Sequence, residues 1–429
     1  MKMRKAAHLE QRFWKREKML NRGNELKDSL KTQALSCTVP SKRTQFCYEK
    51  MHINAKKGSI SAARRGGARP GPSEGSPKMN SLERVRAVIT GQVPDRVPVC
   101  LHNFMMAARE AGIPMERYRV DPEAISQAHL QAWEKYGHDC LLIDTDTTML
   151  AEAMGAKSEC APDEPGRIVR PAICSLADVD RLKVINPDTD GRIPAALEAV
   201  RLLARQLGNE VAIRGNADQM AFDLACMVRG TQEFLMDLAS EPGNPAIHQL
   251  LEVCYQSHLA VHRALVKAGA HLTSFGDSLA GPDVVSPKTF DRFARPYEDR
   301  LVKELVAEGT FTVVHICGDT TKILPFLAQY DFCGFELDYK TDAALAKSSV
   351  GARHILFGNI DPSGVIARGS PQEVRVATRQ LISSWKPGGR FVLNAGCAIP
   401  PTTPPENIRA LIETAHAEGA YGWRCSPNA

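Results

Sequence analysis

A histidine and two cysteines at the ends of apolar segments are the residues of this sequence whose types and spacing could do chemistry. His315 and Cys317 lie two positions apart at the end of FTVVHICG, residues 311–318. Side chains at positions i and i+2 of a strand point to the same face, so this pair could bind one ion from one side. Cys397 closes a second apolar segment, FVLNAGC, residues 391–397, and could complete the set.

One imidazole and two thiolates are a ligand set that zinc prefers. Three protein ligands leave a fourth position open, which is typical of catalytic rather than structural zinc. A histidine and a cysteine in an apolar strand are also typical of an ordinary core, and eighty positions separate Cys317 from Cys397. Spacing alone therefore leaves the zinc site and the core interpretation about equally open.

Carboxylates are a second group of candidates, because they too follow apolar segments. Each could bind a metal, act as a general acid or base, or orient the histidine, although helix capping is the commoner role for any single one. We favour Asp277 as a catalytic residue, because the small residues after it should leave it accessible. The whole group is Asp144, Asp146, Asp277, Glu336, Asp338 and Asp361.

Eight short apolar segments, interleaved with helical patterns over about 350 residues, should position these side chains. Continuous apolar strands joined by helices are typical of parallel sheets, so the pattern predicts an α/β fold, a (β/α)8 TIM barrel. The strand ends of a barrel converge on one mouth, where Cys397 could reach His315 and Cys317. An open doubly wound sheet is the alternative, but neither GxGxxG after the first strand nor GxxxxGK[ST] occurs. The expected strands are 97–101, 140–144, 211–215, 271–277, 311–318, 334–339, 354–360 and 391–397.

Two helix starts are also expected. Ser81 should cap the first helix of the folded region. Thr403, with Glu406 three residues on, predicts a capping-box start for the last helix.

The N-terminal segment differs from the rest of the chain in charge. Residues 1–78 carry 19 Lys and Arg against 6 Asp and Glu, and residues 57–78 are rich in glycine and proline. Such a composition has too little apolar surface to offset the entropy of ordering, so we expect a basic linker or tail, or translated sequence upstream of a start at Met79. Binding of nucleic acid or of an acidic membrane surface is the less favoured alternative. One folded domain is expected over residues 79–429.

Membrane insertion and export are not expected. The longest apolar runs fall far short of the ~18 residues that span a bilayer. The basic N-terminus is not followed by the apolar core of a secretory signal. Twelve irregularly spaced cysteines then indicate reduced thiols, so a cytoplasmic location is expected.

Six longer motifs between about Met79 and Ala420 resemble the uroporphyrinogen decarboxylase superfamily. They are SLERVRAVITGQVPDRVPV, DQMAFDLACMVRGTQEFL, GDSLAGPDVVSPKTFDRFARPY, HICGDT, LFGNIDPSGVIARGSPQEV and NAGCAIPPTTPPENI. The resemblance covers essentially all of the expected folded domain and implies a (β/α)8 barrel, in agreement with the strand pattern.

Within that superfamily the chain is most similar to the corrinoid-dependent methyltransferase branch, typified by methylcobamide:coenzyme M methyltransferases. Decarboxylases carry an arginine-rich motif of the RQAGRY type and a catalytic aspartate after it, and neither is recognisable in PVCLHNFMMAAREAG, residues 98–112. They also carry a histidine in a GHG motif where this chain has Cys397. The methyltransferase branch uses an H-x-C…C zinc set, which His315, Cys317 and Cys397 match.

The resemblance implies Zn2+-dependent transfer of a methyl group between a methylcobamide and a thiol or related acceptor. The chain contains no D-x-H-x-x-G cobalamin-anchoring motif, so a partner corrinoid protein is expected to present the methylcobamide. Decarboxylation of uroporphyrinogen is the second hypothesis, and non-enzymatic binding through the basic segment is the third. The methyl donor, the acceptor and the fourth zinc ligand stay open.

Overall fold

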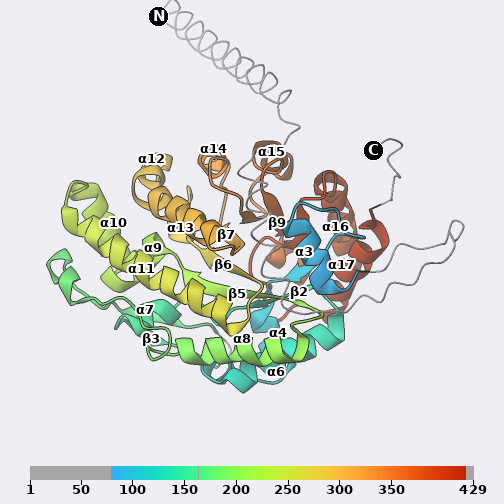
Figure 1. Cartoon of the computed structure of the whole chain (residues 1–429), viewed down its shortest axis with the longest axis horizontal. Helices are drawn as coiled ribbons and strands as arrows, with labels where there is room; N and C mark the ends of the chain where they lie inside the picture. The colour runs from blue at the N-terminus through green and yellow to red at the C-terminus, as the bar shows by residue number, and fades with distance from the viewer. Residues whose placement is uncertain (1–78, 163, 422–429) are drawn as a thin grey trace, which may run out of the picture. The chain divides into compact units, whose positions relative to one another are not determined.

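The computed structural model describes residues 79–162 and 164–421. Eight parallel strands form one sheet in the order β1-β2-β5-β6-β7-β8-β9-β10. A parallel bridge between Val99 and Leu393 joins the two outermost strands, so the sheet closes into a barrel (Figure 1). The strands are β1 (Cys100–Leu101), β2 (Cys140–Ile143), β5 (Ala212–Gln219), β6 (Leu272–Gly276), β7 (Thr312–Ile316), β8 (Gly334–Leu337), β9 (Ile355–Ile360) and β10 (Phe391–Ala395).

The predicted (β/α)8 barrel is confirmed, and the open doubly wound sheet is excluded. Seven of the eight expected segments contain one barrel strand each, and the eighth, 211–215, covers only the first half of β5, which continues to Gln219. The sequence analysis missed an antiparallel pair, β3 (Lys157–Glu159) and β4 (Arg167–Arg170). These strands are short and mostly exposed, so they lack the apolar pattern by which the barrel strands were found.

Helices surround the barrel strands (Figure 1) and bury an apolar face against them. The longest, α11 (Pro245–Ala268), starts at the Asn244 cap and ends at Gly269, whose positive φ of 112° favours glycine. The other α-helices are α3 (Ser81–Ile89), α4 (Phe104–Glu110), α5 (Met115–Tyr118), α6 (Pro122–Tyr136), α7 (Met149–Ala153), α8 (Ile193–Leu207), α9 (Ala221–Arg229), α10 (Thr231–Ser240), α12 (Pro287–Thr289), α13 (Arg295–Ala307), α14 (Leu324–Leu327), α15 (Ala343–Ser349), α16 (Pro371–Trp385) and α17 (Pro405–Glu418). Short 3-10 helices lie at η1 (Leu176–Arg181) and η2 (Ser278–Ala280), and π-helices at η3 (Phe290–Ala294) and η4 (Pro362–Ala367).

Both predicted helix caps are wrong by one position. Asn80, not Ser81, caps α3, in a capping box with Glu83. The Ser81 hydroxyl donates instead to Asp139, at 2.8 Å. The Thr403 hydroxyl donates to the carbonyl of Pro400, and α17 begins at Pro405 after Pro404, with no side-chain cap.

Buried ion pairs fix α3 to the loop that precedes β2. The Asp139 carboxylate has no exposed surface and pairs with Arg84 at 2.6 Å and Arg96 at 2.7 Å. Arg84 also pairs with Asp95 at 2.6 Å. The segment SLERVRAVITGQVPDRVPV therefore contributes to stability at the end of the barrel opposite the strand termini that carry chemistry.

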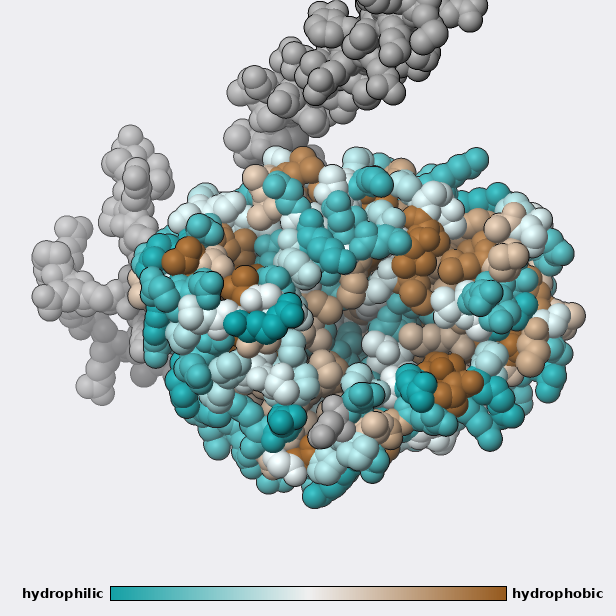
Figure 2. Space-filling view, turned by 180° about the vertical axis from the view of Figure 1, so that it is seen from behind, coloured by the Kyte–Doolittle hydropathy of each residue, from teal (hydrophilic) through white to brown (hydrophobic). Residues whose placement is uncertain are grey.

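Hydrophilic residues predominate on the face shown in Figure 2, which is hollowed near its centre. None of the described helices is long and apolar enough to cross a membrane. All cysteines of the described residues are free thiols, as expected. The predictions for residues 1–78 lie outside the described part of the chain.

Candidate metal centre

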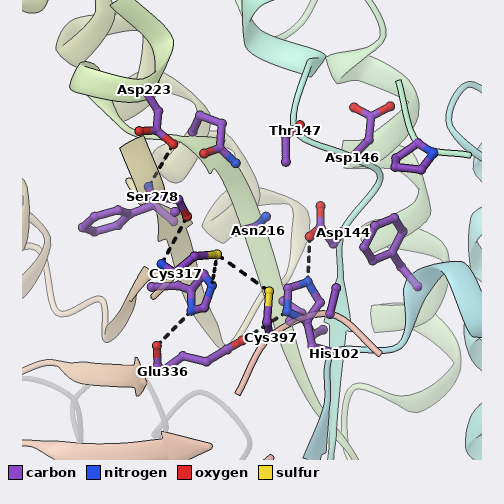
Figure 3. A pocket seen from close by; sticks show the side chains of 18 of the residues that line it. His102, Asp144, Asp146, Thr147, Asn216, Asp223, Ser278, Cys317, Glu336 and Cys397 are labelled. Atoms are coloured by element: carbon purple, nitrogen blue, oxygen red, sulfur yellow. Dashed lines mark hydrogen bonds and ion pairs between the residues drawn. The ribbon is translucent and has the colours of Figure 1, made fainter. Parts of the chain in front are cut away.

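His315, Cys317 and Cys397 meet at the mouth of the barrel. His315 lies in β7, Cys317 directly follows that strand, and Cys397 lies two residues beyond the end of β10. His315 Nε2 is 3.1 Å from Cys317 Sγ, which is 3.7 Å from Cys397 Sγ (Figure 3). All three ligand atoms lie within 4.8 Å of one another. The structure therefore brings together the three residues that the sequence suggested as metal ligands.

The donor set fits zinc. One nitrogen and two sulfurs this close can converge on one tetrahedral ion with little movement, and a fourth position remains for substrate. The three residues line a cavity of about 410 Å³. The other lining residues are divided about equally between polar and apolar ones, and the apolar ones include Met105, Leu142, Met227, Phe275 and Leu279.

Neighbouring groups hold the first ligand in place. His315 Nδ1 donates to the backbone carbonyl of Glu336 at 2.9 Å, which leaves Nε2 facing Cys317. The Cys317 amide donates to Ser278 Oγ at 3.3 Å. A hydrogen bond on the far nitrogen of a ligand histidine fixes the ring orientation, so β8 and η2 support the candidate site from outside.

Without a metal, the three side chains share protons. The hydrogen bond from Cys397 lowers the pKa of Cys317 to about 3 against the effect of burial, and the charge of His315 adds to this. Burial disfavours the imidazolium of His315, but the Cys317 thiolate outweighs it and raises the pKa of His315 to about 10. Contact with the Cys317 thiolate, and then burial, raise the pKa of Cys397. Near pH 7 the group is one imidazolium, one thiolate and one thiol.

A chain of alternating charges lies beside the candidate metal ligands. Glu336 in β8 forms an ion pair with Arg214 in β5. His102, which follows β1, places Nδ1 3.1 Å from Glu336 Oε1 and Nε2 3.0 Å from Asp144 Oδ2 (Figure 3). Burial disfavours the charged form of His102, but the hydrogen bonds to Asp144 and Glu336 raise its pKa to about 9. Burial works against ionised Glu336, yet Arg214 and His102 lower its pKa.

A second ion cluster borders the cavity at Asp146. This carboxylate accepts from Arg119 Nε at 2.7 Å and also pairs with Arg192. Both arginines also pair with Glu152, and the distance from Arg192 Nε to Glu152 Oε2 is 2.8 Å. Two cations and two anions therefore neutralise one another at this edge of the cavity.

The expected accessibility of Asp277 is wrong. Its side chain has no exposed surface, and it is not among the residues that line the cavity. Oδ1 accepts the amide of Asp223 at 2.9 Å, because the chain turns into η2 directly after β6 and points Asp277 inward. Burial, followed by the charges of Asp223 and Glu298, raises the pKa of Asp277. Its catalytic role stays a prediction.

The other candidate carboxylates separate into two groups. Asp144, Asp146 and Glu336 line the cavity. Asp338 instead accepts the amides of Gly318 and Lys340, each at 2.9 Å, and Asp361 caps η4. Asp338 therefore stabilises a loop and Asp361 caps a helix, which are common roles for an aspartate.

Sequence reasoning missed His102, Arg214 and Asp223. His102 directly follows an apolar strand, as the chosen carboxylates do, so position alone could have found it. Arg214 and Glu336 are opposite charges inside two buried strands, and such charges are rarely buried unless paired. Asp223 lies in the first turn of α9 and gave no such signal.

The chain is a (β/α)8 barrel in which one nitrogen and two sulfurs converge at the carboxyl ends of the strands, where TIM-barrel enzymes carry their active sites. Residues 80–418 match the family described as uroporphyrinogen decarboxylase (URO-D). The chain belongs to this family, as its motifs predicted.

The relatives include two kinds of enzyme. The methylcobamide:CoM methyltransferase MtaA of Methanosarcina barkeri is 29% identical over 337 residues, which cover 77% of this chain and 95% of the relative. The uroporphyrinogen decarboxylase of Cellvibrio japonicus is 28% identical over 357 residues, covering 79% and 96%. The solved structure of a methyltransferase from Methanosarcina mazei superposes with a TM-score of 0.73 at 25% identity and covers 79% of this chain and 99% of that one. Identity alone does not choose between the two activities.

Proposed function

We propose that this protein is a zinc-dependent methyltransferase that moves a methyl group between a methylcobamide and a thiol or related acceptor. The observation that supports the proposal is the convergence of His315 Nε2, Cys317 Sγ and Cys397 Sγ in an open cavity. Two thiolates and an imidazole around one point are a donor set that suits catalytic zinc. The similarity to a methylcobamide:CoM methyltransferase over nearly its whole length agrees with this choice.

Bound zinc would supply a Lewis-acid position that favours the thiolate form of the acceptor. The chain's own residues would do the remaining work. His315, Cys317 and Cys397 would hold the ion, and the Glu336 carbonyl would keep the His315 ring in place. The apolar side chains of Phe275 and Leu279 would exclude water, which would otherwise compete with the acceptor for the open position on zinc.

The transfer itself is a displacement at carbon. The acceptor loses its S–H proton, its sulfur forms a bond to the methyl carbon, and the cobalt–carbon bond breaks with its electron pair remaining on cobalt. The products are a methyl thioether and a cobalt(I) corrinoid. The methylcobamide would be presented at the mouth of the barrel by a corrinoid protein.

Anaerobic incubation of zinc-loaded protein with methylcobalamin and 2-mercaptoethanol tests the proposal. We expect the cob(I)alamin absorption to appear, and to be lost after chelation or with Cys397→Ser. Cys174→Ser is the matched control, because Cys174 is an exposed thiol that does not line the cavity. Equal rates with and without zinc would overturn the proposal.

Decarboxylation of a porphyrinogen is the second candidate, favoured by the 28% identity to the Cellvibrio japonicus enzyme. An acidic porphyrinogen needs cations, but Arg214 and His102 at the cavity are already paired with carboxylates. Incubation with uroporphyrinogen followed by analysis for coproporphyrinogen distinguishes the two functions. Formation of coproporphyrinogen by zinc-free protein would favour decarboxylation.

A further inference from the structure

The charges around the cavity bear on which thiol can enter it. His102 has a carboxylate oxygen 3.0–3.1 Å from each ring nitrogen, so both nitrogens donate and the ring is an imidazolium with two anionic partners. Arg214 is 2% exposed and forms its ion pair with Glu336. The charge of each cation is therefore already balanced by a carboxylate, so an anionic group of a substrate could approach only the unpaired Nε of Arg214 and would compete there with the charge of Glu336.

The cations behind the cavity wall are also paired. Arg119 and Arg192 each bind both Asp146 and Glu152. Among the cavity-lining residues of the described chain, no arginine, lysine or charged histidine lacks a carboxylate partner apart from the candidate ligand His315. A zinc ion with two thiolates would add no net charge, because the two negative sulfurs balance it.

Among the described residues, one carboxylate at the cavity has no cationic partner. Asp223, in α9, lines the cavity and accepts the amides of Ser278 at 2.9 Å and Leu279 at 2.7 Å. Burial raises the pKa of Asp223 to about 6, and a hydrogen bond with Asp277 acts in the opposite direction. A carboxylate has about four lone-pair sites, so Asp223 can accept further hydrogen bonds from a ligand.

Asp223 is also close to the candidate metal ligands through one shared residue. Ser278 donates its amide to Asp223, and its hydroxyl accepts the amide of Cys317 (Figure 3). A short molecule could therefore place sulfur at the open metal position and a second group at Asp223.

We infer that the methyl acceptor is a small thiol without an anionic group, of the aminothiol class, whose ammonium group pairs with Asp223. The inference rests on the proposed methyl transfer and deepens it. Burying a sulfonate or carboxylate here would leave a desolvated charge without a partner, which is strongly unfavourable. An ammonium group would instead form an ion pair with the carboxylate of Asp223. The acceptor would then differ in charge from the CoM in the name of the related methyltransferases.

Three thiols that share an HS–CH2–CH2 unit test the inference: 2-aminoethanethiol, 2-mercaptoethanol and 2-mercaptoethanesulfonate. Their binding to the full-length, cobalt(II)-substituted protein is read from the change in its visible absorption, without any methyl transfer. We expect 2-aminoethanethiol to bind at least about tenfold more tightly than the sulfonate, with the neutral thiol between them. Tighter binding of the sulfonate, or equal binding of all three, would overturn the inference and leave the proposed function intact. If no thiol perturbs the spectrum, the proposed function fails and the inference with it.

The variant Asp223→Asn tests where the ammonium group lies. We expect the ratio of affinities for 2-aminoethanethiol and 2-mercaptoethanol to fall about tenfold. Asp331→Asn, which removes a carboxylate that does not line the cavity, should keep the wild-type ratio. An unchanged ratio in folded Asp223→Asn would contradict this placement. If that variant does not fold, the wild-type thiol series still decides the charge of the acceptor.

Discussion

The Sγ atoms of Cys317 and Cys397 lie 3.7 Å apart, although eighty positions separate the two residues. Two barrel strands, β8 and β9, lie between β7 and β10 in the sheet order, and the curvature of the barrel brings the ends of β7 and β10 to one mouth. A closed barrel is thus what converts two isolated cysteines into a pair.

Purified protein should bind about one zinc ion per chain. Mutation of a residue that only hydrogen-bonds to a metal ligand lowers metal affinity by roughly 10–100-fold, and Cys317→Ser or Cys397→Ser should lower it by more. The reason is that each serine removes a sulfur donor. Competition with a chromogenic chelator measures the affinity. Cys174→Ser should behave as wild type, and full zinc retention in both site variants would contradict the assignment.

Zinc binding at pH 7 should release about two protons per ion, because ligands must be deprotonated to bind. In the metal-free protein His315, with its pKa raised to about 10, carries one proton, and the raised pKa of Cys397 retains another. Cys317, with a pKa of about 3, contributes none. Affinity should therefore rise with pH. Calorimetry in buffers of different ionisation enthalpy counts the protons, and a count near zero would refute this proton distribution.

His102 should stabilise the metal-free protein at neutral pH and lose that effect in base. Its folded pKa of about 9 exceeds the unfolded value of 6.5, so its contribution is complete below pH 6.5 and is lost as pH rises through 9. The contribution is on the order of 3 kcal/mol. Urea unfolding of wild type and His102→Asn should show a stability difference at pH 6 that shrinks by pH 10. A difference that grows over this range would reverse the sign and disprove the assignment.

Asp139→Ala should destabilise the fold by about 3–5 kcal/mol, because it leaves buried Arg84 without this partner. Asp139 has no exposed side-chain surface, and that of Arg84 is 3% exposed. Asp178→Ala removes an exposed ion pair with Arg181 and should cost less than about 1 kcal/mol. Denaturant titration compares the two variants. Equal losses would show that burial does not determine the effect.

Asp277→Asn should reduce kcat for methyl transfer by less than about tenfold, if Asp277 acts by positioning Asp223 rather than by touching substrate. The Asp223 amide donates to its Oδ1, and its side chain does not line the cavity. Zinc content should be unchanged, and the KM for 2-aminoethanethiol should change more than kcat. A loss of kcat on the scale of 10²–10⁴-fold would instead support direct acid–base chemistry by Asp277.

Local patterns in the sequence predicted the barrel and suggested the candidate metal ligands. Eight apolar segments alternating with helices require a parallel sheet, because both faces of such strands are buried. His315 and Cys317 share one face of a strand by the two-residue period of the backbone. These properties depend on neighbours along the chain, so sequence alone could predict them.

Only the tertiary structure showed which charged side chains pair with one another and which side chains are buried. Whether Asp277 is buried depends on how the turn after β6 packs against α9, and its exposure was predicted wrongly from the small residues that follow it. Arg214, Glu336, His102 and Asp144 come from four different strands or strand ends, so their pairing exists only once the sheet is closed. The unpaired state of Asp223 is likewise a property of the whole cavity. Whether two charges pair depends on the distance between them in the folded chain, and this distance cannot be read from the order of the residues.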